Sequence, residues 1–397
     1  MLKRDLHDVL LRSAARMPIV TLMGPRQSGK TTLSRAAFPS LPYVSLEIPE
    51  DRSEARHDPV AFLARFPGGA VIDEVQRAPD LLSYLQVDVD RNDAPGRWVL
   101  TGSQNLLLMQ SVSQSLAGRT SLLTLLPFSL GELRGRAPLD VPALDAPAVA
   151  AVAEGADLWE TLWAGFYPRI HDKRLEPRAW LADYHRTYVE RDLRDVLRVM
   201  DIDGFERFVR LTAARTGQEL NLSSLASDAG ISQTAAAQWL AALRTSYLIA
   251  TLPPHHRSYR KRLRKRPKLH FLDTGLACYL LDIRSPDVLR AHPLRGAIFE
   301  SFVVGELVKA FANRGEEAPL FHWRDATGHE VDVIVDLGDR QIPVEVKSGM
   351  TVADDAVDGL AWWTSIASNP NKTGVLIHGG TAFRSHRGFT VRPWWIG

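Results

Sequence analysis

The chain has 397 residues, of which 45% are hydrophobic and 24% are charged, and its formal net charge is +2. This composition allows two or three domains with hydrophobic cores and excludes a wholly disordered chain. The single cysteine, Cys278, excludes a disulfide framework and a multi-cysteine zinc site. No run approaches about 18 consecutive apolar residues, and the first residues lack a signal-peptide core. We therefore expect a soluble, cytoplasmic protein without a membrane partner.

A phosphate-binding loop is predicted near the N-terminus. Residues 24–31 read Gly-Pro-Arg-Gln-Ser-Gly-Lys-Thr and match the pattern G-x-x-x-x-G-K-[ST]. The apolar residues 19–23 predict a buried strand before this loop, and residues 32–37 predict the first turns of a helix after it. In such a junction, backbone N–H groups point at an anion. We expect ATP to bind here, in contact with Gly24, Pro25, Arg26, Gln27, Ser28, Gly29, Lys30, Thr31 and Thr32.

The catalytic groups of this site follow from the same pattern. Lys30 is expected to reach the β- and γ-phosphates, and the Thr31 hydroxyl is expected to ligate Mg²⁺. A short strand is predicted at 43–46 and a helical stretch at 51–66, before a hydrophobic strand at 70–74 that ends in Asp73 and Glu74. We expect Asp73 to hold the hydration shell of Mg²⁺ and Glu74 to orient and deprotonate the attacking water.

Two further polar positions are candidates for contact with the γ-phosphate. An apolar strand at 98–100 ends in Thr-Gly-Ser-Gln, where Ser103 or Gln104 is placed to sense the γ-phosphate or the water; Asn105, next in the chain, is alternatively a helix N-cap. Arg119 follows a predicted helix and is either an arginine finger, acting in cis or from a neighbouring subunit, or a solvated arginine near a helix end.

The order of these motifs resembles bacterial and archaeal AAA-type ATPases that carry a C-terminal domain of unknown function. The resemblance rests on residues 24–31, on V-I-D-E-V-Q at 71–76, on L-T-G-S-Q at 100–104, on L-x-G-R at 116–119 and on L-P-F-S-L-x-E-L at 126–133, with further blocks at 188–193, 268–276 and 296–300. It implies an AAA-type core, a winged-helix segment and a C-terminal region like restriction endonucleases. AAA-type sites are usually completed by an arginine of a neighbour, so homo-oligomers are expected.

The predicted fold is therefore α/β, in four segments. Residues 1–135 are expected to form the P-loop domain with a parallel sheet. Residues 136–215 begin as a Pro- and Ala-rich linker or loose lid and continue as helices, whose aromatic residues are expected to form a core rather than base-stacking platforms. Residues 216–289 are expected to form the winged helix, and residues 290–397 the nuclease-like domain.

Residues 216–289 contain the spacing of a helix-turn-helix. Leu222, Leu225, Ala226 and Ala229 lie on one helix face, Gly230 ends that helix, and Ser232 caps a second helix at 233–245. Strands at 247–252 and 268–271 then flank a wing with the basic residues Arg257, Arg260, Lys261, Arg262, Arg264, Lys265, Arg266 and Lys268. This wing is expected to contact nucleic-acid phosphates in a salt-dependent way, with little base-specific reading; alternatively it is a solvated or subunit-contacting loop.

Acidic residues of the last segment suggest a second metal site. A helix at 298–311 carries Glu300, and alternation places Asp332 on one face of a strand at 329–335, with Glu345 and Lys347 on one face of the next strand. This arrangement resembles the metal site of restriction-type nucleases, in which carboxylates hold Mg²⁺ or Mn²⁺ and the lysine stabilises the attacking hydroxide. Alternatively, this fold serves for docking and its metal site is lost.

The sequence thus predicts an Mg²⁺-dependent ATPase coupled to a half of the chain that handles nucleic acid. An ATP-regulated, metal-dependent nuclease and a nucleotide-switched scaffold with an inactive nuclease fold are the alternatives.

Overall fold

The computed structural model describes residues 2–103, 115–146, 155–188, 201–255, 266–325, 327–367 and 373–395. The chain forms two compact units. Unit 1 consists of Met1–Phe128, Thr245–Tyr247 and Phe311–Glu316. Unit 2 consists of Ser129–Arg244, Leu248–Ala310 and Glu317–Gly397. No helix of the described residues is both long enough and apolar enough to span a membrane.

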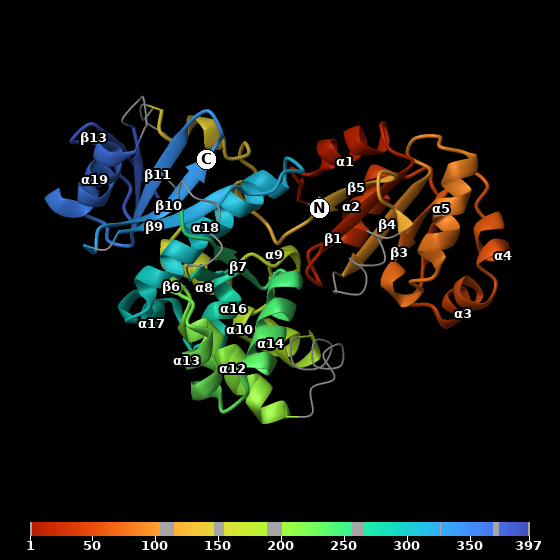
Figure 1. The fold of residues 1–397 in the computed structure, drawn as a ribbon, viewed down its shortest axis with the longest axis horizontal. Helices are drawn as coiled ribbons and strands as arrows, with labels where there is room; N and C mark the ends of the chain where they lie inside the picture. The colour runs from red at the N-terminus through yellow and green to blue at the C-terminus, as the bar shows by residue number, and fades with distance from the viewer. Residues whose placement is uncertain are drawn as a thin grey trace. The chain divides into compact units, whose positions relative to one another are not determined.

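Unit 1 is a parallel sheet between two layers of helices (Figure 1). The strand order is β2-β3-β4-β1-β5, and each observed pairing is parallel. The elements are α1 (His7–Ala14), β1 (Ile19–Gly24), α2 (Lys30–Ala37), β2 (Tyr43–Ser45), α3 (Pro49–His57), α4 (Pro59–Ala64), β3 (Ala70–Asp73), the 3₁₀ helix η1 (Val75–Arg77), α5 (Leu81–Arg91), β4 (Trp98–Ser103) and β5 (Thr120–Thr124). This arrangement confirms the predicted α/β class.

Alternation along β1 explains why both faces of this sheet are covered. Ile19 packs in the core with residues of α3, α4 and α5, whereas Val20 and Leu22 pack in a second core with residues of α1 and α2. Because the strands are parallel, the loops that follow β1, β3 and β4 all leave from the same edge of the sheet. This carboxyl edge is where ligands bind in open α/β sheets.

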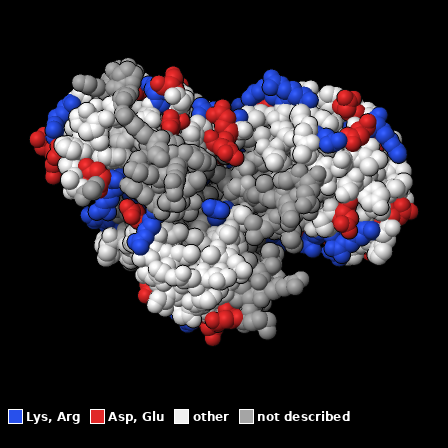
Figure 2. Space-filling model, viewed as in Figure 1, with Lys and Arg blue, Asp and Glu red and all other residues white. Residues whose placement is uncertain are grey.

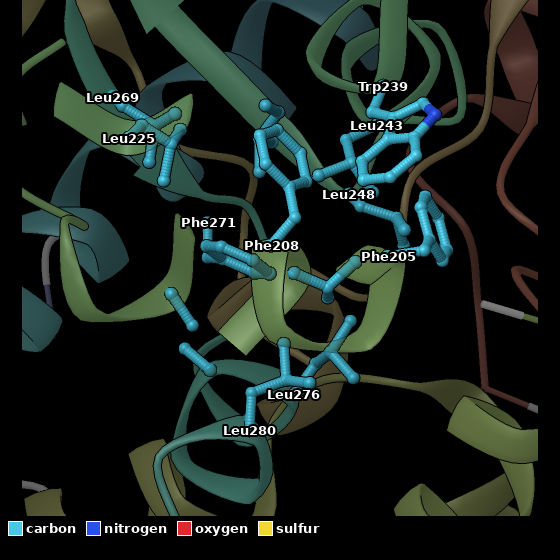
Figure 3. Packing of buried hydrophobic residues seen from close by; sticks show 14 of the residues in the cluster. Phe205, Phe208, Leu225, Trp239, Leu243, Leu248, Leu269, Phe271, Leu276 and Leu280 are labelled. Atoms are coloured by element: carbon cyan, nitrogen blue, oxygen red, sulfur yellow. The ribbon is translucent and has the colours of Figure 1, made fainter. Parts of the chain in front are cut away.

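The first part of unit 2 is a helical bundle around a small antiparallel sheet of order β6-β8-β7. Its core is drawn in Figure 3, where Phe205 and Phe208 of α12 lie near Trp239 of α14. The rings of Phe205 and Trp239 meet edge-on, with centroids 5.2 Å apart. The elements are α7 (Leu130–Arg134), η2 (Val141–Ala143), α8 (Leu158–Ala164), α9 (Pro168–Lys173), α10 (Pro177–Tyr184), α12 (Ile202–Ala214), β6 (Gln218–Glu219), α13 (Leu222–Ala229), α14 (Gln233–Thr245), β7 (Ile249–Leu252), β8 (Lys268–Phe271), α16 (Thr274–Leu280) and α17 (Pro286–Ala291).

The aromatic residues of the middle segment form core, as expected. Tyr167, Tyr184 and Tyr188 are buried in the same cluster, with Trp180 packed against them. The ring centroids of Tyr167 and Tyr184 lie 4.7 Å apart. These side chains are thus not available as base-stacking platforms. Residues 189–193 of the motif at 188–193 lie outside the described residues.

The second part of unit 2 is a six-stranded mixed sheet of order β13-β14-β12-β11-β10-β9. Helix α19 covers one face of this sheet, where Leu360 and Trp363 pack on Val331 and Ile334 of β10. The elements are α18 (Arg295–Ala312), β9 (Leu320–Arg324), β10 (Glu330–Asp336), β11 (Gln341–Lys347), η4 (Asp354–Val357), α19 (Asp358–Ile366), β12 (Val375–His378), β13 (Arg384–His386) and β14 (Phe389–Pro393).

A bulge changes which side chains of β10 share a face. The pairing of β10 with β9 shifts between Val331 and Ile334, so these two residues, three apart, pack in one core. The strict alternation expected for this strand, on which the placement of Asp332 rests, therefore does not hold along its whole length, because an extra residue in a strand reverses the alternation beyond it.

The Pro- and Ala-rich segment is anchored over its described part. Asp145 is buried; its Oδ1 accepts a hydrogen bond from Arg340 Nη1 at 3.2 Å, and its Oδ2 accepts one from Thr373 Oγ1 at 2.6 Å. Arg392 of β14 donates to Ala143 O at 3.0 Å. Residues 142–146 are thus held on the six-stranded sheet, so this part of the segment is not a loose linker or lid, and the bonds to Asp145 keep its charge from being buried alone.

Candidate functional site

The loop between β1 and α2 has the backbone of a phosphate cradle. Gly24 ends β1, and a β-carbon there would lie 2.0 Å from the Leu125 carbonyl oxygen, so only glycine fits. Gln27 and Gly29 adopt positive φ values of 63° and 94°. Helix α2 begins directly at Lys30, and this places the free N–H groups of its first turn at the loop.

Lys30 folds back onto its own loop. Its Nζ donates to Gly24 O at 3.0 Å and to Pro25 O at 2.9 Å, and the side chain is buried. Burial lowers the pKa of Lys30 to about 8, against the opposing attraction of Glu74 and Asp73. The amine of Lys30 is therefore held over the loop by two backbone carbonyl oxygens.

Asp73 lies at the carboxyl end of β3 and is bound by three hydroxyl groups. Its Oδ2 accepts hydrogen bonds from Thr31 Oγ1 at 2.9 Å and from Tyr43 OH at 2.8 Å. Its Oδ1 accepts one from Thr101 Oγ1. The structure thus brings together Thr31 and Asp73, the two predicted Mg²⁺ ligands. Sequence reasoning missed Tyr43 and Thr101, although Thr101 is polar directly after the apolar run at 98–100.

Glu74 follows Asp73 with a positive φ of 57°. For a residue other than glycine, the left-handed backbone conformation costs about 1–2 kcal/mol, and such strain is often found at functional sites. The carboxylate accepts a hydrogen bond from Gln76 Nε2. Burial raises the pKa of Glu74 above its usual value, against the attraction of Lys30. A carboxylate that binds a proton more readily is better suited to act as a general base.

The remaining residues of the predicted nucleotide site have defined places. Pro25, Arg26, Gln27 and Ser28 form the loop, and Thr32 lies in the first turn of α2. Ser103 pairs with Gly24 in the register of β1 and β4, so its backbone lies beside the loop. Gln104 and Asn105 lie outside the described residues.

Arg119 lies at the opposite edge of the sheet from the loop. Thr120 pairs with Ile19, the first residue of β1, whereas the loop follows Gly24, the last. Five residues of strand separate these edges by roughly 16 Å. The guanidinium is bound to Asp90, with Nε 2.6 Å from Oδ1 and Nη2 3.0 Å from Oδ2. This placement argues against the predicted arginine finger in cis, because strand direction puts the start of β5 far from the phosphates.

The acidic residues of unit 2 meet around a lysine. Lys268 of β8 places Nζ 2.6 Å from Glu300 Oε1 of α18 and 3.4 Å from Asp332 Oδ1 of β10. Asp332 Oδ2 accepts a hydrogen bond from the Val346 N–H at 2.8 Å. Glu345 Oε1 accepts one from Lys347 Nζ at 2.6 Å. Burial raises the pKa of Glu300, and the negative charge of Asp332 raises it further, against the attraction of Lys268.

The predicted second Mg²⁺ or Mn²⁺ site is not found here. Across the described ranges, no group of three His, Cys, Asp or Glu side chains is arranged to hold a metal ion. The positive charge within the cluster comes from Lys347, bound to Glu345, and from Lys268, for which the sequence predicts a place on the wing facing phosphate. Lys268 is instead buried, because β8 runs into the core of unit 2.

Comparisons with known proteins agree with this organisation. A family model described as an AAA domain matches residues 16–134, and two domains of unknown function, DUF8612 and DUF4143, match residues 155–287 and 295–396. The uncharacterized proteins Rv2008c of Mycobacterium tuberculosis and Mb2031c of Mycobacterium bovis are each 34% identical over 354 residues, which cover 88% of this chain and 74% of theirs. The chain belongs to this family of AAA-domain proteins.

Solved structures resemble the AAA-domain chain only loosely. The Walker-type ATPase PABY2304 of Pyrococcus abyssi is 16% identical with a TM-score of 0.42, over 70% of this chain and 94% of that one. A STAND protein with a tetratricopeptide repeat sensor from Pyrococcus horikoshii is 10% identical with a TM-score of 0.23, over 77% of this chain and 46% of that one.

The charged surface outside the AAA domain is mixed where it is described. On the face drawn in Figure 2, Lys and Arg are interspersed with Asp and Glu, and no large field of one sign is visible on the described surface. The basic residues Arg257, Arg260, Lys261, Arg262, Arg264 and Lys265 of the predicted wing lie outside the described residues. The wing therefore stays a prediction from sequence.

Proposed function

We propose that the AAA domain binds ATP with Mg²⁺ and hydrolyses it at the loop between β1 and α2. The observation that carries this proposal is the hydrogen bond from Thr31 to Asp73 beside the buried amine of Lys30. A hydroxyl and a carboxylate are oxygen donors of the kind that Mg²⁺ prefers, so these residues fit the ion. When bound, Mg²⁺ neutralises charge on the β- and γ-phosphates.

In this proposal some residues of the site bind the phosphates and the ion, and Glu74 transfers a proton. Lys30 and the N–H groups of the first turn of α2 hold the phosphate oxygens. Thr31 and Asp73, now hydrogen-bonded to each other, would hold the ion through their side-chain oxygens. Glu74, whose pKa is raised by burial, accepts the proton of the attacking water. Ser103 at the end of β4 lies beside the loop and is proposed to sense the γ-phosphate.

Two variants test this proposal. Lys30→Ala should abolish ATP binding in titration calorimetry. Glu74→Gln should keep ATP binding but lose turnover by about 10²–10⁴-fold, the usual contribution of a general base. The matched controls, Lys3→Ala and Glu47→Gln, change exposed residues of unit 1 and should behave as wild type. Normal turnover in both Lys30→Ala and Glu74→Gln would defeat the proposal.

For unit 2 we propose that the segment of α13, α14, β7 and β8 is a winged helix that contacts nucleic acid. The support is local: Asn221 caps α13, Gly230 ends it with φ 71°, and the strands β7 and β8 flank the basic residues of the sequence. Wild-type binding to DNA or RNA should weaken steeply with salt. The role would be overturned if the wild type bound nucleic acid no more tightly than a triple variant with Arg260→Gln, Lys261→Gln and Arg262→Gln.

Of the two alternatives, the contacts of Lys268 favour the scaffold over the nuclease. An ammonium group between Glu300 and Asp332 supplies the charge that a metal ion would supply in a nuclease. We therefore expect no Mn²⁺-dependent cleavage of DNA or RNA by the wild type. Cleavage by the wild type that is lost in both Asp332→Ala and Lys347→Ala would instead support the nuclease alternative.

A further inference from the structure

Arg4 is bound to the phosphate loop from a position just before α1. It is 7% exposed, although it lies close to the N-terminus. Its Nη1 donates to Ser28 O at 2.7 Å, and its Nη2 donates to Leu126 O at 2.6 Å. The guanidinium carbon lies 4.8 Å from the centre of the Phe128 ring. One planar group therefore joins the loop to the segment that follows β5.

The hydrogen bond from Arg4 to Ser28 O affects the orientation of the next amide, the Gly29 N–H. The Ser28 carbonyl and the Gly29 N–H belong to the same peptide group, and in a trans peptide they point in opposite directions. No cis peptide bond occurs among the described residues. A guanidinium held on Ser28 O thus directs the Gly29 N–H away from Arg4. Gly29 precedes the first turn of α2, where N–H groups bind anions.

Arg4 and Lys30 hold different carbonyl groups of one loop. Lys30 is bound to Gly24 O and Pro25 O, and it must release both to reach a phosphate. The bonds of Arg4 to Ser28 O and Leu126 O involve no group that the nucleotide needs. They can therefore persist while Lys30 moves, and so keep the loop in its binding shape.

We propose that Arg4 is a positioning residue for the phosphate loop, which keeps the Gly29 amide aimed at the bound triphosphate. The proposal rests on the ATP site proposed above. Arg4 contacts backbone groups and not the nucleotide, so its loss should weaken ATP binding and leave the chemical step unchanged. A structural role alone would instead lower the fraction of folded protein.

Arg4→Lys and Arg4→Gln test this in the full chain. Lysine keeps the charge, but its single ammonium lacks the planar fork that reaches both carbonyls. We expect the Kd for ATP to rise about tenfold in both variants, with kcat at saturating ATP within about twofold of wild type. Arg12→Gln, which changes an exposed arginine of α1, is the matched control and should keep the wild-type Kd.

Each other outcome overturns the proposal in a distinct way. A wild-type Kd in Arg4→Lys would show that Arg4 acts through charge alone. A lower kcat and melting temperature with an unchanged Kd would show a role in folding only. Wild-type protein that binds no ATP would overturn the ATP site as well, whereas binding in the wild type with an unchanged Kd in both variants overturns only the role of Arg4.

Discussion

The Thr101 hydroxyl of β4 donates a hydrogen bond to Asp73 Oδ1 of the neighbouring strand β3. Both residues are buried at the carboxyl edge of the sheet, and Leu100 and Ile72 pair directly before them. Thr101 thereby binds Asp73 Oδ1, whereas Thr31 and Tyr43 both bind Asp73 Oδ2. The orientation of the proposed Mg²⁺ ligand depends on a strand that carries no part of the phosphate-loop motif.

Thr101→Val should raise the Mg²⁺ concentration needed for half-maximal ATP turnover by about tenfold. Valine has nearly the shape of threonine but leaves Asp73 Oδ1 without its donor, and a hydrogen bond to a charged group is worth about 1.5–3 kcal/mol. Thr120→Val is the control, because the Thr120 hydroxyl bonds Thr21 at 2.9 Å near the opposite edge. A Mg²⁺ titration of turnover that is the same for Thr101→Val and wild type would contradict this prediction.

ATP binding should be accompanied by proton uptake at pH 8. The pKa of Lys30 is about 8 in the free protein, so roughly half of these amines are neutral at that pH. A triphosphate brings negative charge to the amine, which raises its pKa, and the neutral fraction gains a proton. Calorimetry in two buffers of different ionisation enthalpy counts the protons. Lys30→Arg keeps the charge without titrating, so equal counts in both proteins would refute the expectation.

Arg119→Ala should turn over ATP at the wild-type rate in dilute, monomeric protein. The reason is geometric, since Arg119 lies at the amino edge of the sheet and is bound to Asp90. Asp90→Ala is the matched variant, because it removes the partner and keeps the arginine. Turnover should be measured over a range of protein concentrations, beside sedimentation to follow assembly. A fall at high concentration in Arg119→Ala alone would assign Arg119 to the site of a neighbouring copy.

Lys268→Met should destabilise unit 2 by about 3–5 kcal/mol, the usual result of leaving a buried charge without its partner. The side chain of Lys268 is only 11% exposed, and its amine lies between Glu300 and Asp332. Thermal unfolding should show the loss, and Glu300→Gln in the same chain should recover part of it. Lys347→Met, in which the side chain is 45% exposed, should cost less.

The same cluster predicts the response to metal. Mn²⁺ should leave the melting temperature of the wild type unchanged, because Lys268 already supplies the positive charge. A rise in melting temperature with Mn²⁺ that is lost in Asp332→Ala would show that the acidic cluster is open to a metal ion.

The features that the sequence predicted well are those whose causes lie within a few neighbouring residues. The phosphate loop at 24–31 combines glycines for its positive φ values with a strand before it and a helix after it, and the structure has these elements. The helix at 233–245 and the strand at 268–271 were predicted with their observed bounds, since capping and apolar runs are local signals.

The features that only the tertiary structure decided depend on strand order and chain direction. Arg4, Tyr43 and Thr101 reach the site from three separate parts of the chain, and no spacing in the sequence connects them. The sequence leaves the role of Arg119 open between a finger in cis, a finger from a neighbour and a solvated arginine, because its place at the start of a parallel strand follows only from the pairing of β5 with β1. The sequence predicts Lys268 among the basic residues of the wing, whereas the structure buries it between two carboxylates, one on α18 and one on β10. The order of residues determines local features such as loops, caps and strand ends. Which charged groups from distant parts of the chain come into contact is determined by how the strands pair and how the layers pack.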